Sequence, residues 1–579
     1  MFRAAAYVFS KDIFGNRIGA DTIPRIVQYM NIEETLIVLG KALWLIEDDR
    51  LQDASTQLLL ANQFLPEIRQ DICRELVLDG RILFFPSQIR CLMKLIFLHC
   101  KVAVSESPLE NNDLYKIGLA LFATSDFLGK EYRRWNEMFR IDDEDSFTFM
   151  IHQLIGTSYL IRLSNSTYSI TRSKIIFNDI HHEINSENES DYVEIDEVFK
   201  SATGINLLTY IHIGMGIITY FLEYRGMDST PKDGNFILLD PDNWFDSTKV
   251  EKNLVMTVFK LIAVSIDEYR NEIQKHNQRE IGHDFILMRQ RPLLNINNRG
   301  YLPFSFEYLV ERLSIGIYWI IFDYLREFNN NTHLKFSRYV GKLFQEYVNK
   351  LINIINNRQE KKEKLILDSK YFIGNNEYRT PDIILIGENY VILIEVSSTR
   401  LQAKRTTALG IPQAFEDDID KMILHNARSL DTFISNFKTH PNILQNIDCS
   451  SIKKFYPIIV TIEGFPRFQI ISTYIQNRIE EQQLLMDDNI APLSFLDIDD
   501  LEYLEVFCSK RLILLLESWH NSQDFGSFTF THFLKDELDC FDIDRSSYMF
   551  TASQALTKDA SMLLFNLNDM EDFTSAADY

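Results

Sequence analysis

Apolar residues recur at helical spacing through most of the first 330 positions. The run over residues 36–46, for example, places apolar side chains every three or four positions, which is the pattern of a helix that buries one face. We therefore predict a mainly helical N-terminal region over residues 1–240 and a helical connecting region over residues 248–330. The stretch from 226 to 246, with its Pro and Asp content, predicts a break between the two.

The pattern changes after about residue 335. A helical stripe comes first, followed by three apolar strands ending near residue 396, a long helical run over about 411–437 and an apolar strand over 456–462. The stripe is formed by Phe336, Val340, Leu343, Tyr347 and Leu351. The order helix, three strands, helix, strand predicts a sheet covered by helices. The predicted class is multidomain α+β, with an α/β core over 335–470 and an acidic C-terminal extension over 475–579.

Two of the predicted strands form a hairpin that pairs two carboxylates. β-branched runs lie on either side of a short polar break at Gly387-Glu388-Asn389, and counting outward from this turn sets Asp382 directly opposite Glu395. The two Cα atoms would then lie roughly 5 Å apart on one face of the hairpin. A carboxylate pair beside an apolar core is costly unless something neutralises it, and a divalent cation is the obvious candidate. The simpler alternative is a strand-start aspartate and an edge-strand glutamate without a shared ligand.

These residues, in this order of elements, resemble the core of the restriction-endonuclease-like PD-(D/E)xK nuclease superfamily, over residues 335–470 only. In that superfamily a helix glutamate, a Pro-Asp pair and a Glu-x-Lys strand surround one or two magnesium ions. The resemblance places Glu346 at the helix glutamate, Pro381-Asp382 at the Pro-Asp pair and Glu395 at the strand glutamate. It implies that Glu346, Asp382 and Glu395 hold Mg²⁺ or Mn²⁺, and that Asp382 and Glu395 are catalytic.

The lysine position of the family motif falls on Ser397. In the family the lysine ammonium orients or activates the attacking water and offsets charge on the phosphate, whereas a serine can only donate or accept a hydrogen bond. A neighbouring element can supply the lysine in this superfamily. We expect Lys404 to do so first and Lys421 second, with Lys370 also nearby. Gln413, early in the next helix, lies where several members place a polar residue that contacts substrate or water.

The net charge of −23 argues against nucleic acid as a partner, because phosphate binding needs Lys and Arg. The distribution weakens that objection. Residues 331–430 contain about 15 basic and 12 acidic residues, whereas residues 480–579 contain about 5 basic and 21 acidic ones. Because the hairpin lies in the least acidic part of the chain, nucleic acid remains a predicted partner, with DNA ahead of RNA.

Composition indicates an intracellular protein outside the membrane. Residues 205–222 are about long enough to enter a bilayer, but polar residues such as Asn206 and His212 interrupt them, so we predict a buried helix and no membrane span. The six cysteines show no paired spacing and are expected to be reduced thiols. The first seven residues lack the pattern of a signal peptide, so export is not expected and a cytoplasmic location is.

The leading functional hypothesis is a metal-dependent endonuclease that hydrolyses DNA phosphodiester bonds. Large accessory regions on nuclease cores are common in prokaryotic defence systems, so an antiviral role is suggested by analogy. The alternative is a catalytically inactive nuclease-fold subunit that binds nucleic acid or a protein partner, which Ser397 favours. A third possibility is that the acidic chain works only within a complex or as a homo-oligomer.

Overall fold

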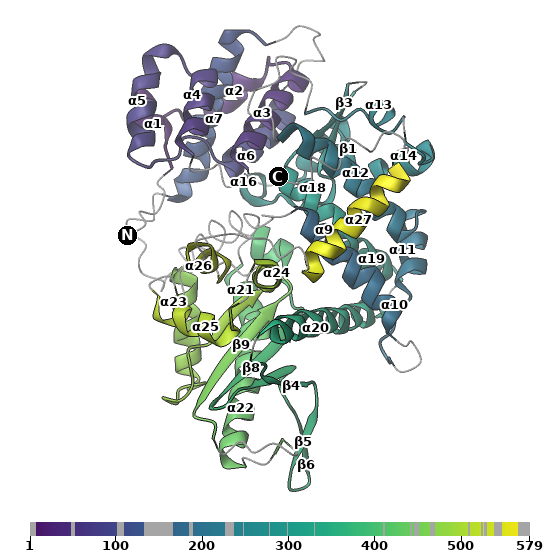
Figure 1. Ribbon diagram of the computed structural model, residues 1–579. Coiled ribbons are helices and arrows are strands. Elements are labelled where there is room, and N and C mark those ends of the chain that lie inside the picture. The colour runs from purple at the N-terminus through teal and green to yellow at the C-terminus, as the bar shows by residue number, and fades with distance from the viewer. Residues whose placement is uncertain are drawn as a thin grey trace.

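The computed structural model places a helical half at the N-terminal end of the chain and a sheet-containing half after it (Figure 1). It describes residues 7–47, 53–100, 109–132, 166–184, 189–225, 237–246, 248–276, 278–297, 299–328, 331–359, 361–408, 411–440, 443–444, 451–463, 469–507, 510–522, 525, 530–537 and 547–564.

The first helices pack around one hydrophobic core. They are α1 (Ser10–Phe14), α2 (Ile23–Val27), α3 (Ile32–Ile46), α4 (Ala54–Phe64), α5 (Glu67–Leu78), α6 (Pro86–His99) and α7 (Asn111–Tyr132). Asn31 and Asp53 cap α3 and α4 by accepting hydrogen bonds from backbone N–H groups of the first turn, as N-cap residues do. The same core also takes in side chains from residues 264–308, so the region predicted over 1–240 shares its interior with the segment that follows it.

The second group of helices surrounds a small sheet. The helices are α9 (Ser166–Lys174), a π-helix (Ile175–Ile180), α10 (His181–Glu183), α11 (Ile195–Thr203), α12 (Leu207–Arg225), α13 (Pro241–Phe245), α14 (Lys252–Ile262), α15 (Ile266–Ile273), α16 (Gln278–His283), α17 (Ile286–Gln290), α18 (Phe306–Leu313) and α19 (Gly316–Arg326). The sheet has the order β1-β2-β3, from Ala263–Ser265, Leu293–Ile296 and Gly300–Pro303. The helical prediction for residues 248–330 missed these strands. A strand of three or four residues is too short for its alternating pattern to be distinguished from the pattern of a helix.

The long helix α20 (Thr332–Arg358) leads into the main sheet, which has the strand order β10-β9-β8-β7-β4. The strands are β4 (Lys364–Leu367), β7 (Ile383–Ile386), β8 (Tyr390–Ser397), β9 (Lys454–Thr461) and β10 (Ser494–Asp497). β7 runs antiparallel to both β4 and β8, while β8, β9 and β10 are parallel. Between β4 and β7 the chain forms a separate two-stranded hairpin of β5 (Lys370–Ile373) and β6 (Asn376–Arg379). The predicted α+β class is confirmed. The predicted helix, three strands, helix and strand occur in that order as α20, β4, β7, β8, α21–α22 and β9, but the β5–β6 hairpin and β10 were not predicted.

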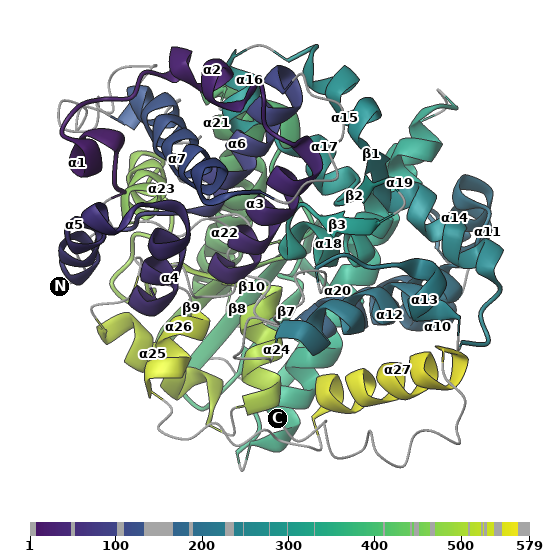
Figure 2. The ribbon, with the colours of Figure 1, turned by 90° about the horizontal axis from the view of Figure 1, so that it is seen from above.

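Helices cover both faces of the main sheet (Figures 1 and 2). One face, including Ile383, Leu385 and Ile394, packs against α20, whose predicted apolar stripe is fully buried. The other face, including Ile384 and Leu393, packs against α21 (Pro412–Ile419), a π-helix (Asp420–Leu424), α22 (His425–Thr439) and α23 (Gln469–Glu481). A further π-helix (Ala403–Ala408) connects β8 to α21. Covering both faces explains why the strand sequences are continuously apolar rather than alternating.

The C-terminal segment completes the main sheet and its core. It contributes β10, α24 (Ile498–Phe507), α25 (Leu512–Asn521), α26 (Phe530–Glu537) and α27 (Tyr548–Leu564). Helix α27, yellow in Figure 1, lies against α9 and α12 of the N-terminal half. One hydrophobic core therefore joins residues 170–221 to residues 491–560 and crosses the boundaries predicted near 240 and 475.

Among the described helices, no single one is long and apolar enough to cross a bilayer. Helices α11 and α12 pass that test only together, as a pair bent by 64°, and by length and composition alone. The predicted burial of the apolar run over residues 205–222 is confirmed, since Leu207, Ile211 and Ile217 of α12 have no exposed surface.

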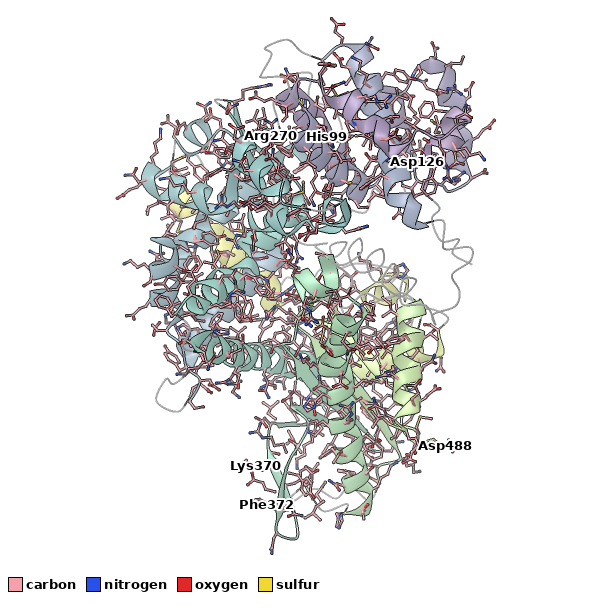
Figure 3. All side chains as sticks on the ribbon, turned by 180° about the vertical axis from the view of Figure 1, so that it is seen from behind. His99, Asp126, Arg270, Lys370, Phe372 and Asp488 are labelled. Atoms are coloured by element: carbon pink, nitrogen blue, oxygen red, sulfur yellow. The ribbon has the colours of Figure 1, made fainter. Side chains whose placement is uncertain are left out.

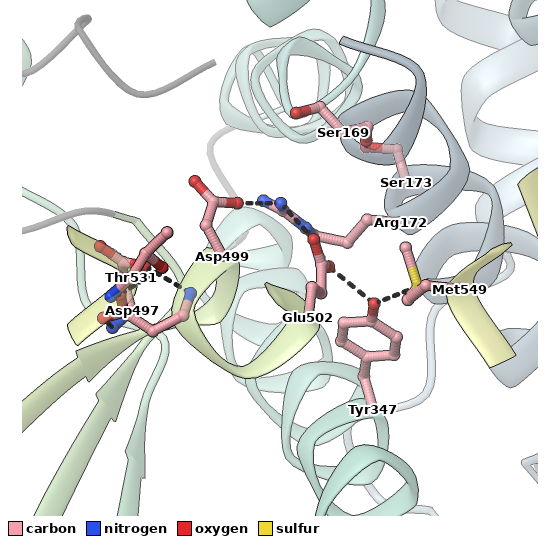
Figure 4. A network of polar contacts seen from close by, with 10 residues as sticks. Ser169, Arg172, Ser173, Tyr347, Asp497, Asp499, Glu502, Thr531 and Met549 are labelled. Carbon is pink, nitrogen blue, oxygen red and sulfur yellow. Dashed lines mark hydrogen bonds and ion pairs between the residues drawn. The ribbon is translucent and has the colours of Figure 1, made fainter. Parts of the chain in front are cut away.

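A polar network joins the N-terminal half to the sheet-containing half (Figure 4). Arg172 of α9 donates from Nε and Nη2 to the two carboxylate oxygens of Glu502 of α24, at 2.6 and 2.8 Å, and also pairs with Asp499. Tyr347 of α20 donates its hydroxyl to Glu502 Oε1 at 2.7 Å. The Glu502 side chain is only 4% exposed. One carboxylate therefore links three helices from distant parts of the chain.

We expect Glu502→Ala to destabilise the protein by about 3–5 kcal/mol, because removing one partner of a buried ion pair leaves charge and hydrogen-bonding groups uncompensated. Thermal unfolding followed by circular dichroism measures the change. The matched control is Glu272→Ala, which breaks the exposed Glu272–Lys275 pair and should cost less than about 1 kcal/mol. Equal shifts of the two melting temperatures would contradict the role of the network.

Candidate metal centre

The pairing of β7 with β8 brings Asp382 and Glu395 together. Ile386 lies opposite Val391 and Ile383 lies opposite Ile394, so the next position outward sets Asp382 against Glu395, as the sequence predicted. Both side chains belong to the sheet face that packs on α22, because they continue the alternation of Ile384 and Leu393. Both are half-buried. The hairpin and its register are therefore confirmed by the structure.

The two carboxyl groups affect each other's ionisation. Burial first, and then the charge of Asp382, raise the pKa of Glu395 to about 8. Burial also raises the pKa of Asp382, against the opposing effect of its hydrogen bonds. The pair behaves as two like charges that cannot both ionise at close range without a counter-ion.

Fixed donors orient both carboxylates. Asp382 Oδ2 accepts a hydrogen bond from the backbone N–H of Val396 at 2.7 Å, and Asp382 Oδ1 accepts one from Gln345 Nε2 of α20 at 2.8 Å. Ser429 of α22 donates its hydroxyl to Glu395 Oε1 at 2.6 Å. Helices on opposite faces of the sheet therefore both reach the pair, one at each carboxylate.

A third carboxylate lies in the same row. The β4–β7 register pairs Leu367 with Ile383, so the next position sets Asp368 beside Asp382, and the Asp368 N–H donates to the Asp382 carbonyl at 2.9 Å. The charge of Asp368 raises the pKa values of both Asp382 and Glu395. Its side chain is exposed. The sequence reading missed Asp368, although its place directly after the apolar run of β4 was the available signal.

Helix α20 presents a different residue to the pair from the one predicted. Gln345, not Glu346, contacts Asp382. Glu346 Oε1 accepts from Lys342 Nζ at 3.0 Å, one turn earlier on the helix. Burial raises the pKa of Asp382, and the positive charge of Lys342 slightly opposes that rise. A Cβ added to Gly341 would lie 2.9 Å from Ser398 Oγ, so α20 passes very close to the end of β8.

The remaining predicted residues lie at varying places around the pair. Lys404 Nζ pairs with Glu280 of α16 at 3.6 Å. Gln413 is exposed on α21 and donates to Asp417 Oδ1 at 3.1 Å. Lys421 is exposed. It precedes Ser429, the residue that donates to Glu395, by eight positions, which is about two helical turns. Whether any of these side chains acts in catalysis remains a prediction.

Ser397 occupies the position of the family lysine but is a buried, uncharged side chain. It lies two positions after Glu395 on the same face of β8, pairs in register with Thr461 of β9 and is only 6% exposed. A buried hydroxyl can bond to a neighbour but cannot supply positive charge.

Comparison with known proteins adds little to this geometry. No family model matches the chain, and a search of curated proteins found no match. Among solved structures, the restriction endonuclease FokI is similar at 12% sequence identity, over 81% of this chain and 92% of that chain, with a TM-score of 0.17. At this TM-score the two backbones do not superpose closely, so the likeness supports no statement about the site.

The raised pKa of Glu395 makes stability depend on pH. A carboxyl whose pKa rises from 4.5 to about 8 on folding binds more protons in the folded state, so its contribution is lost as pH rises through that window. We expect the melting temperature of the wild type to fall between pH 5 and 8, and that of Glu395→Gln to fall less. Thermal unfolding in low salt without divalent ions measures this difference.

Glu463, whose pKa burial also raises to about 8, is present in both proteins and so cancels from the comparison. Added Mg²⁺ should raise the wild-type melting temperature more at pH 8 than at pH 5.5, because the cation competes with the proton on Glu395. Parallel pH curves for the two proteins would contradict the raised pKa of Glu395.

Proposed function

We propose that the protein is a metal-dependent nuclease that hydrolyses phosphodiester bonds of DNA. The observation that carries the proposal is the Asp382–Glu395 pair, two facing carboxylates at one end of a sheet, where burial and the charge of Asp382 raise the pKa of Glu395 to about 8. The order of elements around the pair resembles that of the PD-(D/E)xK superfamily. Perturbed carboxylate pairs of this kind are typical of metal or catalytic sites.

The donor set fits a magnesium or manganese ion. Mg²⁺ keeps several waters and is commonly bound through one or two carboxylates together with substrate phosphates. Among the described residues no group of three potential ligands already converges, which is compatible with a two-carboxylate site completed by water and substrate. Asp382 and Glu395 would hold the ion, with Asp368 next in the row. A bound ion would polarise the scissile phosphate and lower the pKa of an attacking water.

The residues of the chain would prepare the site in three ways. Gln345 and the Val396 N–H fix the orientation of Asp382, and Ser429 does the same for Glu395. Glu395 must release its proton before both carboxylates can serve as ligands. The raised pKa of Glu395 therefore couples cation binding to pH in the neutral range.

Lys342 is the side chain best placed to supply the missing ammonium. It lies one turn before Gln345 on α20, and its charge already acts on Asp382. Lys404 is engaged with Glu280, and Lys421 lies about two turns from Ser429. We therefore place Lys342 ahead of both as the group that orients the attacking water and offsets charge on the phosphate.

The second candidate function is a nuclease-fold subunit that binds nucleic acid without cutting it. Buried, uncharged Ser397 favours this alternative, as does the ion pair that holds Lys342 to Glu346. Three other points remain predictions. They are a protein partner or homo-oligomer, from the acidic charge of the chain, a cytoplasmic location, from the first seven residues, and a role in antiviral defence, by analogy.

We expect Asp382→Asn and Glu395→Gln each to lower Mg²⁺-dependent cleavage of plasmid and linear DNA by at least about 100-fold, since even residues that only support metal ligands are worth about 10–100-fold. Asp242→Asn is the matched control, because Asp242 is an exposed carboxylate that pairs with Lys252 in the N-terminal half. Gel-based cleavage assays in Mg²⁺ or Mn²⁺ give the rates. A wild type that never cuts DNA would favour the binding subunit.

Substitution of Lys342 separates the candidate lysines. Lys342→Met should lower the cleavage rate by about 10²–10³-fold, the usual cost of one group that stabilises transition-state charge, with little change in melting temperature. Lys404→Met and Lys421→Met test the choices made from sequence, and Lys275→Met, far along the chain on an exposed ion pair, is the control. A large loss at Lys404 with none at Lys342 would reverse the assignment.

A further inference from the structure

We propose that the β5–β6 hairpin, residues Lys370–Arg379, is an arm that contacts the backbone of duplex DNA beside the scissile phosphate. The proposal rests on the proposed nuclease function. It goes further by naming a surface outside the metal centre and the form of nucleic acid that fits it. In Figure 3, which shows the molecule from behind, Lys370 and Phe372 mark this hairpin at the end of the sheet-containing half farthest from the N-terminal helices.

The base of the arm is tied to the carboxylate row. The hairpin is inserted between β4 and β7, so it begins just after Asp368 and ends just before Asp382. Thr380 N–H donates to the Ser369 carbonyl at 2.9 Å, and the Thr380 hydroxyl accepts from the Ser369 N–H at 3.0 Å. A phosphate held at Asp382 would therefore lie within three residues of Arg379 along the chain.

The inner face of the arm is anchored. The rings of Tyr371 and Tyr378 stack across the two strands at 5.3 Å, and Tyr371 also meets Phe433 of α22 edge-on at 5.6 Å. Asn436 of α22 donates to the Tyr371 hydroxyl at 3.0 Å. One face of the arm is thus held against α22. The opposite face, which carries Lys370 and Arg379, therefore points away from that helix.

The outer face carries charge that is not balanced within the arm. Lys370 and Arg379 lie directly opposite each other and both are exposed, although like charges in that position repel. Lys370 pairs with Glu377 at 2.6 Å, while the ion pairs of the described residues include none to Arg379. Phe372, on the same face, is 58% exposed. Repelling cations on an exposed face are what an anionic partner such as the phosphate backbone of DNA would compensate.

Further exposed cations lie along the same edge strand. Lys361, Lys362 and Lys364 precede or begin β4, at the strand end beside the β7–β8 turn, where Lys361 pairs with Glu388. In a chain of net charge −23, the cations that lie beside the carboxylate row are those at the base of the arm, Lys370 and Arg379. Phosphate backbone binding requires such cations, whereas an acidic protein surface elsewhere would repel the polyanion.

The shape of the arm favours duplex DNA over duplex RNA. The major groove of B-form DNA, about 12 Å wide, admits a two-stranded ribbon, while the corresponding groove of A-form RNA is too narrow for side chains to enter. A ribbon of four residues a strand, with cations along one face, can lie along or in such a groove.

The test measures binding separately from cleavage. The full-length Asp382→Asn protein is titrated against a fluorescein-labelled 24-base-pair DNA duplex in EDTA, at salt concentrations from 50 to 200 mM. Each phosphate contact contributes about 0.9 to the slope of log K against log salt. Adding Lys370→Ala and Arg379→Ala should lower that slope by about 1.8 and weaken binding most at low salt.

Matched controls use exposed residues far from the arm. Lys275→Ala and Arg326→Ala remove cations from comparable exposed ion pairs and should leave the slope unchanged. Phe372→Ala should weaken binding at all salt concentrations, whereas Phe328→Ala, at a site 55% exposed, should not. Melting temperatures confirm that each variant is folded.

Several outcomes would overturn the proposal. They are an unchanged salt slope in the arm variants, equal losses in the control variants, no DNA binding by the starting protein, or tighter binding to an RNA duplex of the same sequence. Failure of the nuclease function is a separate result. It would appear as absent cleavage by the wild type in Mg²⁺ while the arm variants still lower the slope measured in EDTA.

Discussion

The candidate site depends on one constraint, the register of β7 against β8. Because side chains alternate between faces, a slip of one residue would send Asp382 to the α20 face and leave Glu395 alone among apolar side chains of the α22 face. Both strands are buried on both sides, so a slip would also exchange well-packed residues between two different cores. The hydrophobic interior of the sheet therefore fixes the position of the polar pair at its edge.

Distant segments hold the helix that reaches this pair. α20 packs on the sheet through its apolar stripe, and Tyr347 at its centre donates to Glu502, which in turn holds Arg172 of α9. β10 and α24 come from the C-terminal region, after residue 490. The parts of the chain therefore share cores. The helix that carries Gln345, which contacts Asp382, is therefore held in part by Arg172 of α9 through Glu502.

Local signals predicted the hairpin, the stripe of α20 and the two principal carboxylates, because each rests on short-range periodicity. The β5–β6 hairpin was missed because most of its outer residues are polar and each strand has only four residues. Neither the period of a strand nor that of a helix can be recognised over so short a segment. β10 was missed because Ser494–Asp497 is recognisable only from its pairing with β9. The sequence could not show that Gln345, rather than Glu346, contacts Asp382. That choice depends on how α20 is rotated about its own axis, which tertiary contacts such as that of Gly341 with Ser398 determine.

The absence of lysine at position 397 has a physical reason in this fold. Ser397 is 6% exposed, between Thr461 of β9 and the helices of the α22 face, so an ammonium there would lose most of its hydration. The flank of α20 has no such cost, since the Lys342 side chain is 35% exposed and keeps Glu346 as a counter-ion. The positive charge can then reach Asp382 across the surface rather than through the core. In that arrangement Glu346 pairs with Lys342, and its role as a ligand of a cation stays a prediction.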